Sequence, residues 1–291
     1  MNPVLIFTHF LNGLLMVALP VAVGILLARK FQLGWRLWWI GAVTFVLSQI
    51  GHIPFNVAVG LLFERGILPT PAPSIGVVFS AVFAGLSAGV WEESFRYGAF
   101  RWWAKEARSW SKALMLGSGW GGAEAIILGI LVLINYVVMV AAQVGDISSL
   151  IPEGQAALLD QQIAVYWSLP WYDTLLGALE RAFALTVQIC LSVMVVQVFI
   201  RKNILWLFIA IGWHALVDAL AVYLVSTTSA YVTEAVIGIT AIISLVVIYA
   251  LRQPEYAREE PQIISQPTPS DMTNIIVDDP SLEKLDESKY D

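Results

Sequence analysis

Charged residues are scarce in this chain of 291 residues. They make up 13% of the sequence and hydrophobic residues make up 58%, whereas a soluble domain carries about 25% charged residues. The charges are also unevenly placed. Residues 253–291 hold 10 acidic and 3 basic residues, a net charge of −7, and residues 1–252 hold 12 acidic and 13 basic residues, a net charge of +1. The isoelectric point of about 5.1 therefore describes the C-terminal segment, and we expect no nucleic-acid partner.

Cysteine is almost absent. Cys190 stands alone inside an apolar stretch, which excludes a disulfide bond within the chain. Tryptophan, by contrast, is frequent, and many of the 12 tryptophans lie near the ends of apolar stretches. Aromatic side chains favour the interface between a membrane and water, so this placement is typical of a membrane protein.

Long apolar stretches follow one another along residues 1–252. A helix needs about 20 apolar residues to cross the hydrocarbon core of a bilayer. Stretches of this length lie near residues 4–28, 37–63, 74–100, 113–142, 172–199, 204–225 and 233–251. The sequence therefore predicts an all-α protein of the cell membrane, a polytopic transmembrane helix bundle of about seven spans over residues 1–252.

Lysine and arginine lie almost entirely on one side of these spans. They follow the first, third, fifth and seventh spans, whereas the opposite loops offer only Arg65. Because basic loops stay in the cytoplasm, we expect the N-terminus outside and the C-terminus in the cytoplasm. A short helix is expected on the outer surface within 143–171. Residues 253–291, rich in proline, serine and acids, are expected to form a disordered acidic cytoplasmic tail.

Ionisable side chains inside the predicted spans are the main functional signal. Each costs about 2.5–3.5 kcal/mol on insertion scales and marks a candidate site. In chain order these and the accompanying amides are Gln49, His52, Asn56, Glu92, Glu93, Arg96, Glu124, Glu180, Arg181, Gln188, His214 and Asp218. Five of them are carboxyls and only two are guanidinium groups, so full ionisation would leave three excess negative charges. Bound protons or a cation must offset that excess, which suits acid–base chemistry.

Helical spacing groups several of these residues. Glu92 and Arg96 are four residues apart, as are His214 and Asp218, so each pair shares a helix face. Gly117, Gly121 and Glu124 line one side of a span, which favours close contact with a neighbouring helix.

Arg181 and Gln188 are seven residues apart and also share a face. Glu180 points about 100° away from Arg181 and is expected to find its partner elsewhere.

Simpler interpretations exist for several of these residues taken alone. The Glu92 and Arg96 pair is a common kind of structural ion pair, and His52 near two amides is more often a hydrogen-bonded core histidine than a ligand. The whole set is harder to explain in this way, and it predicts one shared polar site.

Several ordered motifs resemble a known family. The segment 91–97 contains a Glu-Glu-x-x-Arg motif in which Glu92, Glu93 and Arg96 match the YhfC-type intramembrane proteases, within the group that holds the CAAX-processing, bacteriocin-processing and PrsW proteases. Further similar segments are 48–54, 119–124, 180–184 and 214–218. The resemblance covers roughly residues 1–250.

This resemblance implies a membrane-embedded helical peptidase. In such a peptidase the glutamate pair supplies the general base that activates water, Arg96 orients it, and His214 with Asp218 forms the last histidine motif. That histidine binds a metal or stabilises the oxyanion. Two positions depart from the family, because Gln188 and Trp120 stand where relatives would carry histidine.

The two departures bear on metal binding. A catalytic zinc site needs about three protein ligands, and this chain would need His214, a carboxylate such as Glu93, and either His52 or Asp218. The metal-free mechanism is therefore the better fit, and a divalent metal such as zinc is the alternative.

Three functions follow for the predicted site. The first is an intramembrane endopeptidase acting on a membrane protein or a lipidated peptide. In it Glu92 or Glu93 deprotonates water, His214 oriented by Asp218 stabilises the oxyanion, Gln188 positions water or substrate, and Glu124 completes the site. The second is an inactive relative that binds a membrane-protein partner. The third is a proton- or ion-coupled transporter, against which the lack of a visible internal repeat counts.

Overall fold

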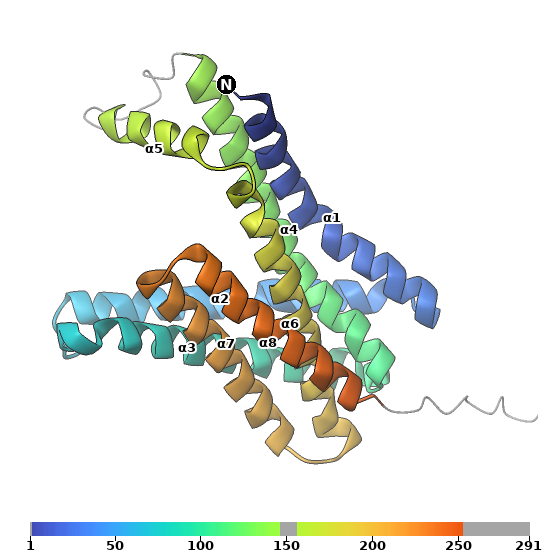
Figure 1. The fold of residues 1–291 in the computed structure, drawn as a ribbon. Helices are drawn as coiled ribbons and strands as arrows, with labels where there is room; N and C mark the ends of the chain where they lie inside the picture. The colour runs from blue at the N-terminus through green and yellow to red at the C-terminus, as the bar shows by residue number, and fades with distance from the viewer. Residues whose placement is uncertain (1, 146–155, 253–291) are drawn as a thin grey trace, which may run out of the picture. The chain divides into compact units, whose positions relative to one another are not determined.

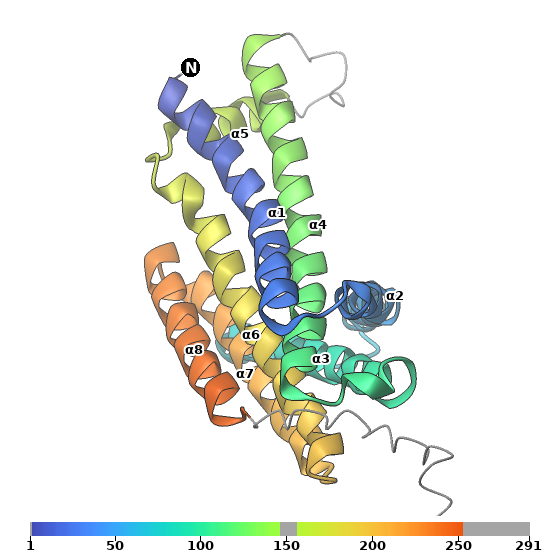
Figure 2. The same ribbon diagram turned by 90° about the vertical axis from the view of Figure 1, so that its right-hand side faces the viewer.

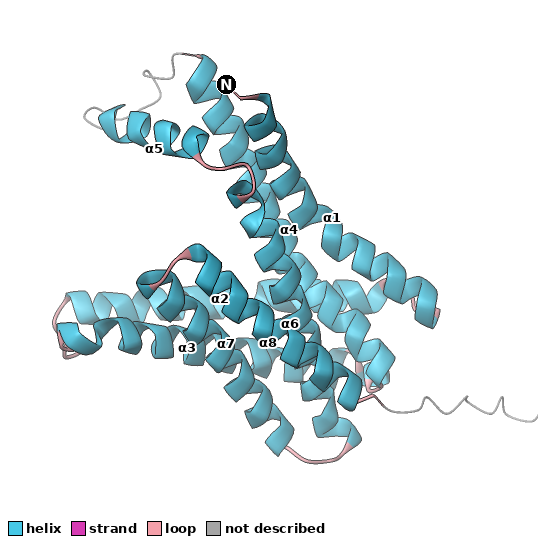
Figure 3. Ribbon diagram, in the orientation of Figure 1, coloured by secondary structure: helices cyan, strands magenta, loops and turns pink. Residues whose placement is uncertain are grey.

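The computed structural model describes residues 2–145 and 156–252, and these are helical with short connections and no strands (Figures 1 and 3). The α-helices are α1 (Pro3–Phe31), α2 (Arg36–Glu64), α3 (Gly76–Gly98), α4 (Trp110–Val144), α5 (Ala156–Ser168), α6 (Leu176–Ile200), α7 (Leu205–Thr227) and α8 (Ala230–Ala250). Short 3-10 turns precede α3 at Pro73–Ile75 and α6 at Asp173–Leu175. A π-helical turn at Ala99–Trp103 and a 3-10 turn at Lys105–Ala107 follow α3.

Seven of these helices are long and apolar enough to cross a membrane. They coincide with the seven predicted stretches, so the all-α multi-span fold is confirmed, and α5 provides the predicted short helix. The orientation of the termini stays a prediction from loop charge. The predicted acidic tail, residues 253–291, lies outside the described residues.

Helix α6 lies at the centre of the bundle. In its most apolar window 67% of the residues are buried, compared with at most 39% in any other span. It packs against α1, α4, α7 and α8 and also touches α3. Side chains on α6 therefore meet side chains from several neighbours, although its sequence is as apolar as theirs.

Glycines set the close contacts that place the polar residues. A Cβ atom at Gly85 or Gly89 on α3 would lie 2.2 Å from the carbonyl oxygen of Ala215 or 2.8 Å from that of Ile211 on α7. Only glycine allows this approach. The close packing of α3 on α7 places Glu93, one turn after Gly89, against His214, which lies between Ile211 and Ala215.

The predicted glycine strip on α4 also forms a helix contact. Added Cβ atoms at Gly117 and Gly121 would lie 2.8 Å from the Cα atom of Ile189 and the Cβ atom of Gln188, both on α6. The prediction of a close contact beside Glu124 is therefore confirmed.

Helices α2 and α3 form an antiparallel hairpin that is steeply inclined to α1 and α4 (Figures 1 and 2). The crossing of α2 over α4 is close, because a Cβ atom at Gly41 would lie 2.1 Å from the carbonyl oxygen of Leu116. This crossing carries the middle of α2 to the polar residues of α3.

Candidate functional site

Glu93 is the fully buried member of the α3 glutamate pair. Its Oε2 lies 2.9 Å from Arg96 Nε, with both side chains 0% exposed, and its Oε1 lies 2.8 Å from His214 Nδ1 on α7. Helix spacing favoured Glu92 as the partner of Arg96, and the structure corrects this, because the ion pair is formed by Glu93 three residues away.

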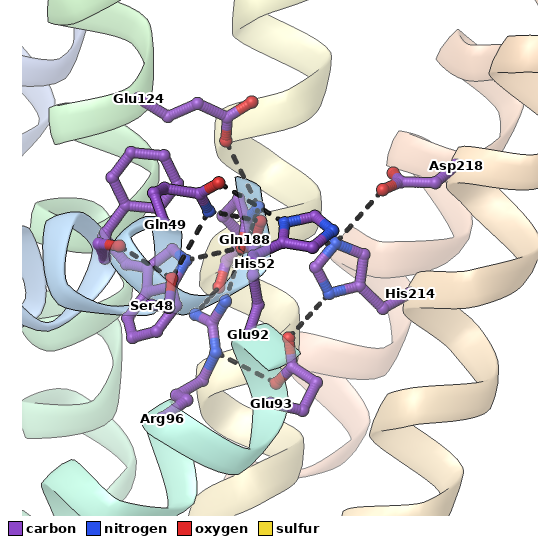
Figure 4. A network of polar contacts seen from close by, with 12 residues as sticks. Ser48, Gln49, His52, Glu92, Glu93, Arg96, Glu124, Gln188, His214 and Asp218 are labelled. Atoms are coloured by element: carbon purple, nitrogen blue, oxygen red, sulfur yellow. Dashed lines mark hydrogen bonds and ion pairs between the residues drawn. The ribbon is translucent and has the colours of Figure 1, made fainter. Parts of the chain in front are cut away.

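Glu92 faces a different set of groups, all of them neutral amides or rings. Gln49 Nε2 donates to its Oε1 at 3.0 Å, while Trp120 Nε1 and Gln188 Nε2 donate to its Oε2 at 3.1 and 3.4 Å. These three donors come from α2, α4 and α6, so Glu92 stands where four helices meet (Figure 4). Each donor stabilises a carboxylate rather than a carboxylic acid.

Arg96 joins the α3 pair to α6. Its Nη1 donates to the Gln188 carbonyl oxygen at 2.9 Å and to Ser192 Oγ at 2.6 Å, and its Nη2 donates to Gln188 Oε1 at 2.5 Å. The guanidinium also lies 4.1 Å from the centre of the Trp120 ring, a cation–π contact. Trp120 therefore both donates to Glu92 and packs on Arg96. The sequence indicated only that Trp120 stands where relatives would carry histidine, and did not indicate this role.

His214 is 2% exposed and lies among three carboxyls. With Nδ1 bonded to Glu93, its Nε2 lies 4.0 Å from Glu92 Oε2 and 3.5 Å from Asp218 Oδ2. The expectation that Asp218 orients the imidazole is modified, because the shortest contact, on the opposite nitrogen, belongs to Glu93. Asp218 is the more exposed partner, at 39%.

A second ionic cluster lies beside this one. Glu124 Oε1 is 2.7 Å from Arg181 Nη1, and Arg181 also pairs with Glu180 through two contacts. The expectation that Glu180 finds another partner is wrong, because its long side chain reaches around the helix to its neighbour. Gln188 connects the two clusters, since its Nε2 donates to Glu124 Oε2 at 3.2 Å as well as to Glu92.

The structure thus brings the predicted site residues into one connected polar network (Figure 4). Hydrogen bonds or ion pairs link Glu92, Glu93, Arg96, Glu124, Gln188, His214, Asp218 and, through Gln49, His52. The predicted catalytic roles stay predictions.

One participant in the network was missed from the sequence. This is Ser192, which accepts from Arg96 and is four residues after Gln188, a spacing that would have placed it on the same face. Gln49 was noted as a polar residue, but its hydrogen bond to Glu92 was not predicted. Outside the network, Glu234 on α8 was not noted, and its Oε2 atom is buried without a hydrogen-bond partner within residues 2–145 and 156–252.

The fold and the network define a multi-pass membrane protein with a buried carboxylate–imidazole site. The chain belongs to the YhfC intramembrane metalloprotease family, whose model matches residues 15–255. It is also similar to the uncharacterized membrane protein YhfC of Bacillus subtilis (strain 168), with 31% identity over 217 residues, 73% of this chain and 82% of that protein. No solved structure matches the chain.

These comparisons confirm the family resemblance and the multi-pass membrane location. The family's name suggests protease function. The wider relationship to the CAAX-processing enzymes stays a prediction.

The family's name also implies a metal ion, and the arranged side chains can be tested for one. Both oxygens of Glu93 are engaged by Arg96 and His214, and both ring nitrogens of His52 contact amides at Gln49 and Asn56. No three His, Cys, Asp or Glu side chains of the described segments converge as a metal site, whereas zinc needs about three protein ligands. The predicted ligands His214, Glu93 and His52 therefore do not fit a metal in this arrangement.

Proposed function

We propose that this protein is an intramembrane endopeptidase in which Glu92 activates water for attack on a peptide carbonyl. The observation that carries the proposal is that Glu92 Oε2 and His214 Nε2 face each other at 4.0 Å, each held from behind by its own partners. This separation exceeds a direct hydrogen bond and suits a water bonded to both groups. The substrate class is a membrane protein or a lipidated peptide.

The two glutamates take different roles in this mechanism. Glu92, whose partners are neutral N–H donors, accepts the proton of the attacking water. Glu93 holds His214 through Nδ1. When His214 carries a proton on Nε2, it donates to the developing oxyanion, and the Glu93 carboxylate offsets the charge of the imidazolium. The carbon–nitrogen bond then breaks, and the proton taken by Glu92 passes to the leaving amine.

Arg96 and Gln188 position these groups. Arg96 fixes the Glu93 carboxylate from the side opposite His214, and the same guanidinium fixes the Gln188 oxygen, which turns the Gln188 amide N–H groups toward Glu92 and Glu124. No step passes through a metal ion.

Substitution of the base tests the proposal. Purified protein in liposomes is given a mixture of single-span peptides, and products are identified by mass spectrometry. Glu92→Gln should lower kcat by a factor of about 10² to 10⁴, the usual loss of a general base, and a zinc chelator should leave the native rate intact. Equal loss of activity in Glu92→Gln and the chelated native protein, with recovery of the latter on adding zinc, would refute the metal-free mechanism.

A second candidate is an inactive relative that binds a membrane-protein partner, favoured by Gln188 at a position where the family motif predicts histidine. An imidazole at 188 cannot accept from Arg96 while donating to both Glu92 and Glu124, as the amide does. If Gln188 serves catalysis, Gln188→His should lower the native rate by about tenfold or more through misplaced groups. Cleavage that is absent from the native protein and present in Gln188→His would identify the native chain as the binding relative.

A further inference from the structure

His52 belongs to a chain of hydrogen bonds that starts at Ser87 and ends on Glu92. Ser87 Oγ is 2.6 Å from Asn56 Oδ1, Asn56 Nδ2 is 2.9 Å from His52 Nε2, and His52 Nδ1 is 3.3 Å from Gln49 Oε1. The last contact is the 3.0 Å bond from Gln49 Nε2 to Glu92. Side chains of α2 thus connect two positions on α3, a turn and a half apart.

The Glu92 carboxylate, at the end of this series, sets the donor and acceptor of every hydrogen bond in the series. An ionised carboxylate only accepts, so Gln49 turns its N–H group to Glu92, and its second N–H points to Ser48 Oγ at 3.3 Å. The Gln49 oxygen is then left for His52, which must donate from Nδ1. His52 Nε2 carries no proton in the neutral ring and accepts from Asn56, whose oxygen accepts from Ser87.

This arrangement excludes two other roles for His52. Two of the links are carboxamides, which do not give up a proton readily, so the chain fixes orientation and does not relay protons. The lone pair on Nε2 is engaged by Asn56, so it is not presented to a metal ion.

We propose that His52 is a positioning residue of the site, locked in the Nδ1–H tautomer, that holds Gln49 with its amide N–H toward Glu92. The proposal rests on the proposed role of Glu92 as the base. Without the Nδ1–H donor, the Gln49 oxygen loses its hydrogen bond and the amide is held only through Glu92 and Ser48. The Glu92 carboxylate is then less firmly fixed toward the attacking water.

The tautomer can be measured independently of activity. Neutral imidazole nitrogens with and without a proton have well-separated ¹⁵N shifts, and the chain contains only three histidines, so His52→Asn identifies the His52 signals by their loss. We expect a protonated Nδ1 and an unprotonated Nε2 in the native protein in liposomes. A protonated Nε2 with a bare Nδ1 would overturn the proposal.

A pair of substitutions tests the positioning role. The amide nitrogen of asparagine reaches approximately the place of Nδ1, and that of glutamine approximately the place of Nε2. His52→Asn should therefore keep the donor to Gln49 and most of the rate, whereas His52→Gln should lower kcat by about 10- to 100-fold with little change in KM. Thr44→Val is the control and should match the native rate, because it removes a hydroxyl of α2 whose one hydrogen bond among the described residues is to the Ile40 carbonyl.

The outcomes separate this inference from the peptidase proposal. Equal losses in His52→Asn and His52→Gln would overturn the positioning role while Glu92-dependent cleavage stands. A native protein that cleaves no peptide, yet has His52 protonated on Nδ1, would refute the peptidase proposal. It would still support the predicted direction of the hydrogen bonds from Ser87 to Glu92.

Discussion

The two arginine clusters of the membrane region differ in burial and in stoichiometry. Arg96 and Glu93 are a pair with side chains 0% exposed, whereas Arg181 is shared by Glu124 and Glu180, which are 24% and 36% exposed. A fully buried pair is costly to desolvate and is retained only where its geometry is excellent or its specificity is needed. The difference indicates that the Arg96 cluster sets the geometry of the site, and that the Arg181 cluster supports it from a partly exposed edge.

Removing the buried guanidinium should produce the largest effect. Arg96→Met leaves the Glu93 carboxylate without its guanidinium partner, and breaking one side of a buried pair costs about 3–5 kcal/mol. Thermal unfolding in detergent measures this change. A loss below about 1 kcal/mol would show that water or another group compensates Glu93, and the contrast between the clusters would disappear.

The same change in the second cluster should cost less. Arg181→Met leaves Glu124 and Glu180 with partial access to solvent, so we expect a loss of about 1–3 kcal/mol, the range for an unsatisfied polar group. Because Glu124 also holds Gln188, kcat should fall as well. An Arg181→Met protein less stable than Arg96→Met would reverse the ranking of the two clusters.

An exposed ion pair should give the smallest loss of stability in this series. Arg36 and Glu106 pair with side chains 67% and 46% exposed, and pairs of this kind contribute about 0–1 kcal/mol. Arg36→Met should therefore change the melting temperature little, and less still at high salt.

The sign of any pH effect at this pair follows from Glu106. Its own backbone N–H, followed by Arg36, lowers the pKa of the Glu106 carboxyl. The pair's contribution is therefore present at neutral pH and lost as the pH falls through the lowered pKa. Melting curves of native and Arg36→Met protein at neutral and acid pH should converge in acid.

The sequence was sufficient for the helices and for most residues of the polar network, although Ser192 was missed. Apolar length fixed seven spans and helical spacing found the Gly117 and Gly121 contact, since both depend on one helix at a time. Which polar side chains contact one another was less predictable. Glu92 and Glu93 are both compatible with Arg96 by spacing, and only the approach of α7 at Gly85 and Gly89 decides that Glu93 meets His214. Gln49 could not be assigned for the same reason, because its role depends on how α2 crosses α4.

The central position of α6 has a consequence for how the protein is made. This helix carries Glu180, Arg181 and Gln188, and an arginine costs about 2.5–3.5 kcal/mol when a helix enters lipid alone. The partners that neutralise or bond these groups, Glu124 on α4 and Arg96 on α3, are synthesised earlier in the chain. Helices α3 and α4 should therefore remain near the insertion machinery until α6 emerges. A nascent chain that ends before α6 should be recognised as incomplete and degraded.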